Sequence, residues 1–374
     1  MKHIDITSTP IEEIISQSIA VLHAGGLVLF PTETTYGAGV DATNQEAVNR
    51  LLSYKSRREG KPLSIMVTDE EMAKQYVLIN EQAHALYEQF LPGPVTVISK
   101  SLDSVDKNGQ RIAQGVASEF GTLGVRIPDY DLMLAITQAF GRPITATSAN
   151  ASGQRRPYSV ADILVGLSEK QKSLIDLVLD AGELPKNEPS TVIDTTLSTP
   201  VVLRTSDRVE HTQVSETKTG DRKVTTLFSR SEQETKEIAG RIVLKHWDDI
   251  TETGLVIGLD GDLGMGKTIF TKGSAEFLKI EEIIKSPTYT YIEEYDFTRH
   301  QTSGKLYHLD MWKVESQAEF ERLAIETLLG TNTVLIIEWF SQVAELIAPL
   351  LKNVPLVTVR FSQVGEDRKL EIIE

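Results

Sequence analysis

Apolar residues recur at every third or fourth position in two stretches of the chain, STPIEEIISQSIAVLHAGG (8–26) and SRSEQETKEIAGRIVLKHW (229–247). This period places the apolar side chains on one face of a helix, so both stretches are predicted to be amphipathic helices. Each begins with residues that satisfy the free N–H groups of a first helical turn, namely Thr9, Pro10 and Glu12 in one and Ser231 and Glu234 in the other. Thr9 and Ser231 are the expected N-caps.

Each predicted helix is followed by a short aliphatic run that is typical of a buried strand, LVLFPT (27–32) in the first half and LVIGLD (255–260) in the second. Further runs of this kind lie between helix-like segments, at 96–100, 123–128, 144–150 and 334–339. Because strands and helices alternate, we expect α/β layering in both halves.

A polar stretch separates the two halves. Residues 205–223, TSDRVEHTQVSETKTGDRK, are nearly free of aliphatic side chains, which is typical of an exposed linker. A chain of 374 residues is also longer than most single domains. We therefore expect an N-terminal domain over residues 1–208, a linker over 209–223 and a C-terminal domain over 224–374.

Composition narrows the class of protein. The chain has 38 Lys and Arg against 53 Asp and Glu, a formal net charge of -15, and both halves carry more acidic than basic residues. This sign disfavours non-specific binding of nucleic acid. The chain has no cysteine, which excludes disulfides, thiolate metal sites and cysteine nucleophiles. No apolar run approaches the length of a membrane span and the first residues lack a signal-peptide pattern, so we expect a cytoplasmic protein.

A phosphate-binding motif follows the second aliphatic run. GDLGMGKT (261–268) matches G-x-x-x-x-G-K-[ST] in full, between a predicted strand and a predicted helix, as the motif requires. Its glycines let backbone N–H groups turn inward around phosphate oxygens, Lys267 reaches the β and γ phosphates, and Thr268 offers its hydroxyl to Mg²⁺. The whole motif is predicted to bind nucleotide: Gly261, Asp262, Leu263, Gly264, Met265, Gly266, Lys267 and Thr268.

A metal-bound nucleotide also needs a carboxylate at the end of a neighbouring strand. Glu338 closes the run VLIIEW (334–339) and would emerge at the carboxyl edge of the sheet, where α/β folds bind ligands. Asp310 in LYHLDMW (306–312) is the second candidate. Either acid can also act simply as a cap of a strand or helix.

Four motifs of the second half stand in a characteristic order: GDLGMGKT, SPTYT (286–290), YHLDMW (307–312) and IIEW (336–339). Their order and spacing resemble the bacterial TsaE-type ATPases over residues 224–374. The resemblance implies that this half binds and hydrolyses ATP in support of the TsaD–TsaB-type complex, which transfers a threonylcarbamoyl group to tRNA adenosine.

The same resemblance implies roles for individual residues. Thr268 and Glu338 would bind Mg²⁺. SPTYT, with Thr288 at its centre, would be a nucleotide-sensitive switch, and Asp310 and Trp339 would be functional residues of the site.

The first half gathers cations in one short loop of an acidic chain. They are Lys55, Arg57, Arg58 and Lys61, within YKSRREGKPLS (54–64). Alone, such a cluster is more often a solvated surface. PTETTYGAG (31–39) and TSAN (147–150) are equally ambiguous alone, because many strand-to-loop junctions look like them.

Taken together, the motifs of the first half all point to the same family. PTETTYGAG, the Lys-x-Arg of KSR, LPGPVT (91–96), LGVRIP (123–128), TSAN and STVID (190–194) occur in an order that resembles the YrdC-like threonylcarbamoyl-AMP synthases, also called TsaC, over about residues 8–208. The implied fold class is α/β: a YrdC-like twisted-sheet domain followed by a P-loop NTPase-type α/β domain.

The resemblance implies a catalytic set in the first half, Lys55, Arg57, Ser148 and Asn150. It places substrate and nucleotide near a second set, Thr32, Lys61, Arg126, Ser190 and Arg204, with Thr32 at the threonine pocket. Arg58 is assigned to solvent.

The implied reaction accounts for the cations. The amine of threonine captures CO₂ or bicarbonate, and the new carboxylate oxygen attacks the α-phosphate of ATP and expels pyrophosphate. These reactants are all anionic, so Lys55, Arg57 and Lys61 are expected to offset their repulsion. No general base or covalent nucleophile is evident, and we expect catalysis by positioning and charge stabilisation. The seven histidines show no metal-ligand spacing and are interpreted as structural or surface residues.

The chain is thus expected to be a fusion of a threonylcarbamoyl-AMP synthase with its pathway's ATPase, using Mg²⁺ with ATP. Its expected partners are L-threonine, bicarbonate or CO₂, ATP and the transferase complex, with tRNA contacted only through that complex and no membrane. Hydrogenase-maturation proteins also contain a YrdC-like domain, but their Cys-rich zinc fingers are excluded in a chain without cysteine. The remaining alternative is an RNA-binding regulatory protein with an ATPase module, which the net charge disfavours.

Overall fold

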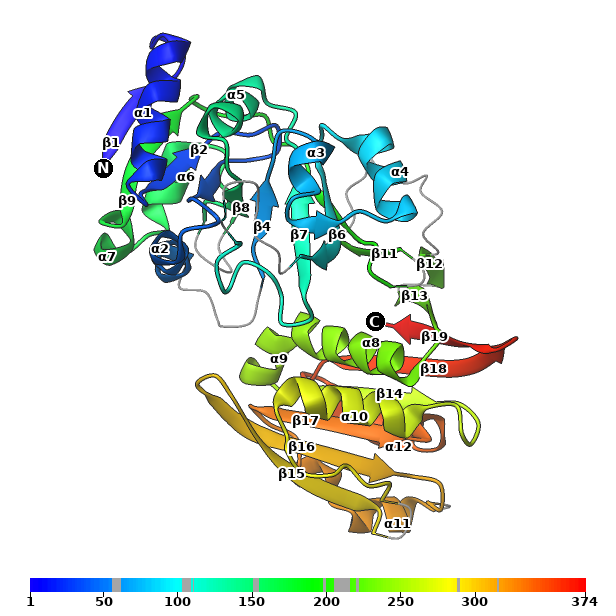
Figure 1. Ribbon diagram of the computed structural model, residues 1–374. Coiled ribbons are helices and arrows are strands. Elements are labelled where there is room, and N and C mark those ends of the chain that lie inside the picture. The colour runs from blue at the N-terminus through cyan, green and yellow to red at the C-terminus, as the bar shows by residue number, and fades with distance from the viewer. Residues whose placement is uncertain are drawn as a thin grey trace. The chain divides into compact units, whose positions relative to one another are not determined.

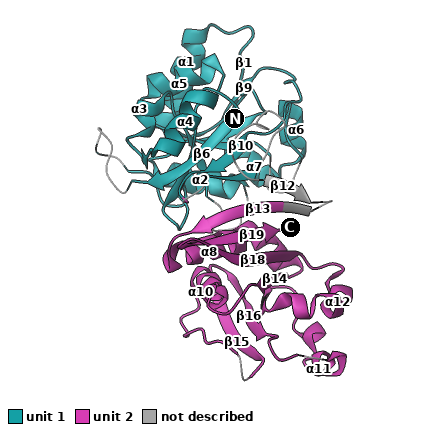
Figure 2. Ribbon diagram, turned by 90° about the vertical axis from the view of Figure 1, so that its right-hand side faces the viewer, with its two compact units in different colours: residues 1–196, 200–213 teal, residues 197–199, 214–374 magenta. Residues whose placement is uncertain are grey.

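Both halves of the chain form sheets flanked by helices in the computed structural model (Figure 1). The structure describes residues 1–55, 62–102, 109, 111–150, 155–197, 200–204, 216–219, 222–287, 290–314 and 316–374. The chain falls into two units, one of residues 1–196 and 200–213 and the other of residues 197–199 and 214–374 (Figure 2). The predicted α/β class is confirmed in both.

The N-terminal unit contains short helices between the strands of one mixed sheet. Its elements are β1 (Lys2–Asp5), α1 (Ile11–His23), β2 (Leu27–Phe30), β3 (Gly37–Gly39), α2 (Gln45–Lys55), β4 (Ser64–Met66), α3 (Glu70–Ala73), β5 (Val77–Leu78), α4 (Glu81–Phe90), β6 (Val95–Ser101), β7 (Thr122–Arg126), α5 (Asp131–Phe140), β8 (Ile144–Ser148), α6 (Val160–Val165), α7 (Glu169–Lys172), β9 (Ile175–Asp180), β10 (Thr191–Asp194) and β11 (Val201–Arg204).

The strand order of this sheet is β1-β9-β2-β3-β8-β4-β7-β6-β10-β11, with β5 paired to β6. The pairs β1–β9, β2–β9, β4–β7 and β6–β10 are parallel, and the others are antiparallel. Gly37 of β3 is the register partner of Ser148 of β8. The loop before β3 and the segment after β8 therefore leave the sheet side by side.

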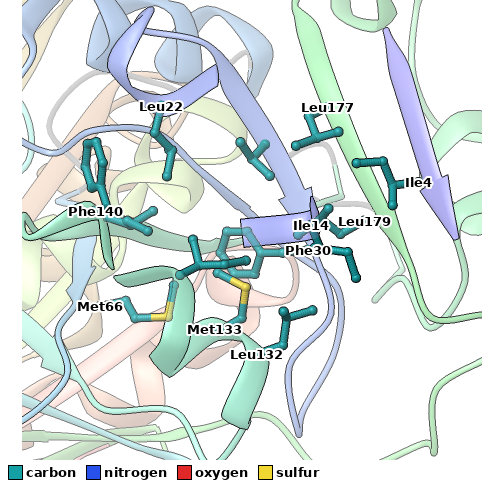
Figure 3. Packing of buried hydrophobic residues seen from close by; sticks show 13 residues of the cluster. Ile4, Ile14, Leu22, Phe30, Met66, Leu132, Met133, Phe140, Leu177 and Leu179 are labelled. Carbon is teal, nitrogen blue, oxygen red and sulfur yellow. The ribbon is translucent and has the colours of Figure 1, made fainter. Parts of the chain in front are cut away.

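Helices α1 and α5 cover one face of this sheet through a single apolar cluster (Figure 3). Ile14 and Leu22 come from α1, Met133 and Phe140 come from α5, and Phe30 from β2 packs among them. Burial of apolar surface of this kind stabilises the fold by about 25 cal/mol per Å². The cluster thereby anchors β2, the strand that leads directly into the PTETTYGAG loop.

The C-terminal unit contains a second sheet and its own helices. Its elements are β12 (Glu216–Thr219), β13 (Arg222–Ser229), α8 (Glu232–Lys245), α9 (Trp247–Glu252), β14 (Leu255–Asp260), α10 (Lys267–Leu278), β15 (Ile292–Arg299), β16 (Thr302–Asp310), α11 (Gln317–Arg322), η2 (Ile325–Thr327), β17 (Thr333–Glu338), η3 (Phe340–Gln342), α12 (Ala344–Ile347), η4 (Ala348–Leu351), β18 (Leu356–Val364) and β19 (Asp367–Ile373).

The strand order of the second sheet is β12-β13-β19-β18-β14-β17-β16-β15. Its central strands are parallel, in the pairs β14–β18, β14–β17 and β16–β17, and antiparallel pairs flank them on both sides. Helices α8 and α10 lie against each other on one face (Figure 1). On the other face, Val256, Leu335 and Ile337 pack with Phe340 and Ile347. Among the described helices, none combines the length and apolarity that a membrane span requires.

The predicted strands are confirmed, but two local predictions were wrong. Pro10, not Thr9, is the N-cap of α1, because its extended backbone (φ -58, ψ 139) lies outside the helix while its carbonyl accepts the N–H groups of Glu13 and Ile14. No side chain caps this helix end. Ser231 is the N-cap of α8 and accepts from the N–H of Glu234, as predicted.

The second correction concerns the expected linker. Residues 216–219 form β12, and β13 starts at Arg222, also inside the predicted stretch 209–223. The β-branched residues Thr217 and Thr219 favour a strand although the stretch is polar. The rest of that stretch lies outside the described residues, so the domain limits 1–208 and 224–374 stay a prediction.

Candidate functional sites

Lys55 is the last residue of α2 and only 4% exposed. Its Nζ donates to the backbone oxygen of Ser148 at 2.7 Å and to that of Asn150 at 2.5 Å. The neighbouring Tyr54 hydroxyl donates to the backbone oxygen of Ala149. The end of α2 thus contacts each of residues 148–150 at the end of β8, of which Ala149 is buried, and this segment receives a cation.

Ser148 and Asn150 also bond to each other. The Ser148 hydroxyl donates to Oδ1 of Asn150 at 2.6 Å. The backbone N–H of Ala149 donates to the oxygen of Tyr36, which closes the PTETTYGAG loop onto this segment. Three residues of the predicted catalytic set, Lys55, Ser148 and Asn150, therefore lie together.

A second polar group lies where β7 ends. Nη2 of Arg126 donates to Oε1 of Glu33 and to the hydroxyl of Thr34, both at 2.9 Å. Thr32 belongs to the same group, since its hydroxyl donates to the backbone oxygen of Thr35 and lies 3.1 Å from that of Thr34. Thr32 and Arg126 thus lie at the same loop, and the roles predicted for them, in threonine and nucleotide binding, stay predictions.

Two atoms of this group are buried without a hydrogen-bond partner in the described part of the chain, Oε2 of Glu33 and Nε of Arg126. Buried polar atoms are usually paired, so unpaired ones indicate a place where a ligand or water completes the bonding. Sequence reasoning missed Glu33. It is the single acid of PTETTYGAG, and that isolation among hydroxyl groups was the available signal.

The structure gives less information on the other site residues predicted for the first half. Ser190 is buried and directly precedes β10. Arg204 lies in β11 opposite Val192, and only its backbone is described. Arg57, Arg58 and Lys61 lie outside the described residues, so their roles stay predictions.

In the second half, the predicted strand, loop and helix are β14, residues 261–266 and α10. Gly261, Gly264 and Gly266 have positive φ values of 146°, 81° and 105°. Glycine adopts these values without strain. A Cβ on Gly261 would also lie 2.8 Å from Phe361, so the loop passes close to β18.

Lys267 is folded back onto its own loop. Its Nζ donates to the backbone oxygens of Gly261 at 2.7 Å and Asp262 at 3.1 Å, and lies 4.1 Å from the ring centroid of Trp339. Burial lowers the pKa of Lys267, although nearby carboxylates, foremost Glu338, act to raise it. The lysine is therefore a buried cation beside the loop that would hold phosphates.

Glu338 and Asp310 end the adjacent strands β17 and β16 and are register partners. Both are buried. The Thr268 hydroxyl donates to Oε1 of Glu338 at 2.9 Å, which joins the two residues predicted to hold the metal. Asp310 accepts the N–H of Trp312 at 3.0 Å and so shapes the chain after β16.

The donor set of Thr268 and Glu338 suits Mg²⁺, a hard cation that prefers oxygen ligands and keeps several water or phosphate oxygens. No group of three or more His, Cys, Asp or Glu residues that could hold a metal occurs among the described residues. Two protein oxygens beside a phosphate loop fit a metal that arrives with a nucleotide.

Trp339 follows Glu338 in the left-handed region at φ 59°. Its ring meets that of Trp312 with centroids 4.5 Å apart at 51°. A non-glycine residue in this conformation stores strain and is common at functional sites. Thr288 lies outside the described residues, so its predicted switch role is not tested.

His308 is a functional candidate that sequence reasoning missed, because all histidines were interpreted as structural or surface residues. Its side chain is 0% exposed in β16, with Nε2 2.9 Å from Oε1 of Glu338. Its place two residues before Asp310, on the same face of the strand, was the available signal.

Comparison with known proteins adds two family matches. The Sua5/YciO/YrdC family model, described as "Telomere recombination", matches residues 20–206. The TsaE family model, described as "Threonylcarbamoyl adenosine biosynthesis protein TsaE", matches residues 229–370.

Curated relatives match the first half. A putative threonylcarbamoyl-AMP synthase of Methanocaldococcus jannaschii is 36% identical over 169 residues, 45% of this chain and 74% of the relative. A threonylcarbamoyl-AMP synthase of Pyrococcus abyssi is 34% identical over 187 residues, 49% of this chain and 51% of the relative. The chain thus spans about half the length of the second relative.

A solved structure with a similar fold is the crystal structure of P. abyssi Sua5 complexed with L-threonine. The alignment covers 90% of this chain and 91% of the Sua5 chain, at 20% identity and a TM-score of 0.49.

Proposed function

Because the chain belongs to the Sua5/YciO/YrdC family through residues 20–206 and carries a TsaE domain over residues 229–370, we propose that it serves threonylcarbamoyladenosine synthesis with two separate nucleotide sites. Both resemblances inferred from the motifs are confirmed by these matches. The chain spans about half the length of the curated threonylcarbamoyl-AMP synthases of Pyrococcus abyssi and Bacillus subtilis.

The N-terminal unit would make threonylcarbamoyl-AMP and pyrophosphate from L-threonine, bicarbonate or CO₂, and ATP. The amine nitrogen of threonine bonds to the carbon of CO₂ and loses a proton, giving an N-carboxylate. One oxygen of that group attacks the α-phosphorus of ATP, and the bond to the β-phosphate oxygen breaks to release pyrophosphate. Names of the curated relatives support this substrate class.

Lys55 supports this chemistry through its position. Carbonyl oxygens of Ser148 and Asn150 fix its ammonium group without neutralising the charge. A fixed cation stabilises anionic reactants and the charge that develops at the α-phosphate, since no reorganisation is needed during the reaction. Lys55 would therefore reduce the repulsion between the N-carboxylate and ATP.

The group around Arg126 supports ligand binding near the same loop. The unpaired Oε2 of Glu33 needs a donor and the unpaired Nε of Arg126 needs an acceptor. An amino acid or a nucleotide supplies both kinds of group. This group would orient a substrate beside the PTETTYGAG loop.

The C-terminal unit would bind and hydrolyse ATP and so support a TsaD–TsaB-type transferase complex. Residues 261–266 would hold the phosphates through backbone N–H groups, and Lys267 would leave its carbonyl partners to contact the β and γ phosphates. Thr268 and Glu338 would hold Mg²⁺, which neutralises phosphate charge when bound.

The observation that carries the proposal is the meeting of Lys55 with the segment 148–150, which lies 93 residues away along the chain. The matching test is incubation of the full chain with threonine, bicarbonate, ATP and Mg²⁺, followed by mass detection of threonylcarbamoyl-AMP and measurement of pyrophosphate. We expect both products, and neither when threonine is omitted.

The RNA-binding alternative is tested by a salt-dependent tRNA-binding assay run beside the pyrophosphate assay. Tight, salt-dependent binding of tRNA without threonine-dependent pyrophosphate would contradict the synthase proposal and favour that alternative.

A further inference from the structure

Arg368 in β19 is a basic residue on a face of the second sheet that is otherwise packed with apolar side chains. Residues two apart on a strand share a face, so Arg368 lies on the same face as Leu370, which is fully buried. Leu370 is the register partner of Phe361, whose ring centroid lies 6.0 Å from that of Phe270 in α10. Arg368 therefore lies on the face of the sheet that α10 covers.

The side chain of Arg368 lies against the end of the phosphate loop. Gly266 is the N-cap of α10 and directly precedes Lys267. A Cβ built on Gly266 would lie 3.5 Å from both Cδ and Nε of Arg368. The stem of this arginine thus passes over Gly266, and its guanidinium group begins at the start of α10.

This position is electrostatically unfavourable for a cation, because the N-terminus of a helix carries a partial positive charge. The charged neighbours of Arg368 in β19 pair with other residues. Asp367 pairs with Arg230 at 3.4 Å, and Lys369 pairs with Glu371 at 2.6 Å. Within the described part of the chain, the side chain of Arg368 makes no ion pair or hydrogen bond. A cation held at the positive end of a helix without an acid indicates that an anion binds there.

The order of the strands indicates which part of a nucleotide Arg368 would meet. β14, which leads into the phosphate loop, lies between β17 and β18. Glu338, which is proposed to hold Mg²⁺ with Thr268, ends β17 on one side. Arg368 comes from β19, beyond β18 on the other side. The β and γ phosphates that bind the metal would lie toward β17, so the phosphate on the side of Arg368 is the α-phosphate.

We propose that Arg368 binds the α-phosphate of the nucleotide held by residues 261–266. This inference rests on the nucleotide site proposed for the C-terminal unit. A guanidinium group donates two parallel, charge-assisted hydrogen bonds to phosphate oxygens. The bound phosphate also removes the repulsion between Arg368 and the start of α10. The arginine thereby contributes to nucleotide affinity from the side of the loop opposite the metal.

Calorimetry on the full chain with ADP and a chelator tests this contact, and the binding event of the C-terminal site is the one that Lys267→Ala removes. Arg368→Gln should weaken this event about tenfold, the effect of losing a hydrogen bond to a charged group. It should also make the ADP affinity less dependent on NaCl concentration, because one cation is lost. Arg368→Lys keeps the charge and should keep the salt dependence of the wild type. The matched control is Arg322→Gln in α11, since Arg322 is exposed in the same unit.

Two further measurements separate binding from folding and locate the contact. Without nucleotide, Arg368→Gln should unfold at the same temperature as the wild type or at a higher one, because the substitution relieves repulsion at the start of α10. With Mg²⁺ present, the loss of ADP affinity should be the same factor as with the chelator, because effects on separate phosphates add.

Each other outcome overturns a stated claim. A wild type without an ADP binding event that depends on Lys267 overturns the proposed nucleotide site and this inference with it. Wild-type ADP affinity in Arg368→Gln overturns only the inference. Weaker binding with unchanged salt dependence, or a loss that differs between Mg²⁺ and chelator, overturns the assignment to the α-phosphate. Lower thermal stability without nucleotide shows that Arg368 acts in folding.

If the variants do not fold, chemical modification of the wild type decides. Phenylglyoxal reacts with guanidinium groups, and digestion followed by mass analysis shows which arginines are modified. ADP should protect Arg368 and leave the modification of Arg322 unchanged. Equal modification of Arg368 with and without saturating ADP overturns the inference.

Discussion

Lys55 and Lys267 are both buried lysines whose ammonium groups donate to backbone carbonyl oxygens. Such oxygens are neutral acceptors, so they hold the cation in place without cancelling its charge. Each lysine lies beside a loop rich in small polar or glycine residues. At the residue scale, each unit thus holds a cation fixed by carbonyl oxygens beside the site that we propose for anionic substrates.

Lys55→Met removes the charge and keeps much of the apolar stem. We expect threonine-dependent pyrophosphate release to fall by about 10²–10³-fold, the usual effect of losing one preorganised electrostatic group. The measurement is the initial rate of pyrophosphate formation on folded protein. Lys74→Met is the control, because Lys74 is an exposed lysine paired with Glu70 and Glu71. A wild-type rate in the Lys55 variant would contradict the role given to Lys55.

Titration of a partly buried cluster, Lys245, His246, Asp249 and Glu374, predicts how stability depends on pH. Burial acts to raise the pKa of Glu374, but hydrogen bonds from His246 and Lys245 outweigh it and lower that pKa from 4.5 to about 2. For His246, burial acts to lower the pKa, and hydrogen bonds to Glu374 and Asp249 outweigh it, so the pKa lies above 6.5.

The direction of each pH effect follows from the coupling between protonation and folding. Glu374 stabilises the fold fully above pH 4.5 and loses this effect as the pH falls toward 2, whereas His246 contributes fully below pH 6.5 and loses its effect as the pH rises through its folded value. Urea unfolding of Glu374→Gln should therefore show a deficit of about 1 kcal/mol or less that is largest near pH 5–6, since solvent screens the pair. Glu366→Gln, at an exposed turn, is the control. A deficit that persists at pH 2 would contradict this account.

The position of a site residue could be predicted where a sequence motif specified both the residue type and the elements around it. Thr268 and Glu338 meet as expected because the motif and the strand end each specify a position. Glu33 and His308 were missed because their importance comes from partners far along the chain, Arg126 and Glu338. A single sequence does not display such pairings.

At the scale of elements, helix α10 carries the phosphate-loop lysine and threonine, and its packing on α8 sets where they lie. A Cβ built on Gly273 of α10 would lie 2.4 Å from Cα of Lys236 in α8. The two helices therefore approach more closely than any residue but glycine allows.

Gly273→Ala should separate these helices and destabilise the C-terminal unit by about 2 kcal/mol, because the clash outweighs the better helix propensity of alanine. Thermal unfolding followed by circular dichroism measures the effect. Gly330→Ala should be tolerated, since nothing lies within 4 Å of a Cβ at that position. Equal stability of the Gly273 variant and the wild type would show that α8 and α10 can move apart without cost.

Elements were predicted well where hydrophobic period and length agreed, as for the strands β2, β14 and β17. The ends of helices and the edge strands were harder to predict. Pro10 displaced Thr9 as a cap through backbone geometry that composition does not reveal. The strand β12 was not predicted from the sequence. It lies at the edge of its sheet and needs no apolar face, so its polar residues show no alternation of apolar and polar positions.

At the scale of the whole molecule, two sheets with separate apolar clusters carry two separate candidate sites. The proposed reactions differ in the phosphate bond that breaks: one releases pyrophosphate and the other leaves ADP. The products therefore report on each unit independently.

Lys267→Ala should reduce hydrolysis of ATP to ADP by at least about 10²-fold and leave threonine-dependent pyrophosphate release within about twofold of the wild type. Both products are measured in the same reaction, with the partner complex added where hydrolysis alone is slow. Lys272→Ala, on the same helix, is the control. Loss of both products in a folded Lys267 variant would contradict two independent sites.

The rings of Trp312 and Trp339 are tilted against each other, and the Lys267 ammonium lies 4.1 Å from the centroid of the second ring, so the C-terminal unit has a fluorescence signal of its own. All 3 tryptophans of the chain lie beyond residue 223, so the first unit is silent in tryptophan emission. When Lys267 leaves the ring for a phosphate, that emission should change without any label. The tryptophan emission of the C-terminal unit would then report in real time how the two units compete for one pool of ATP.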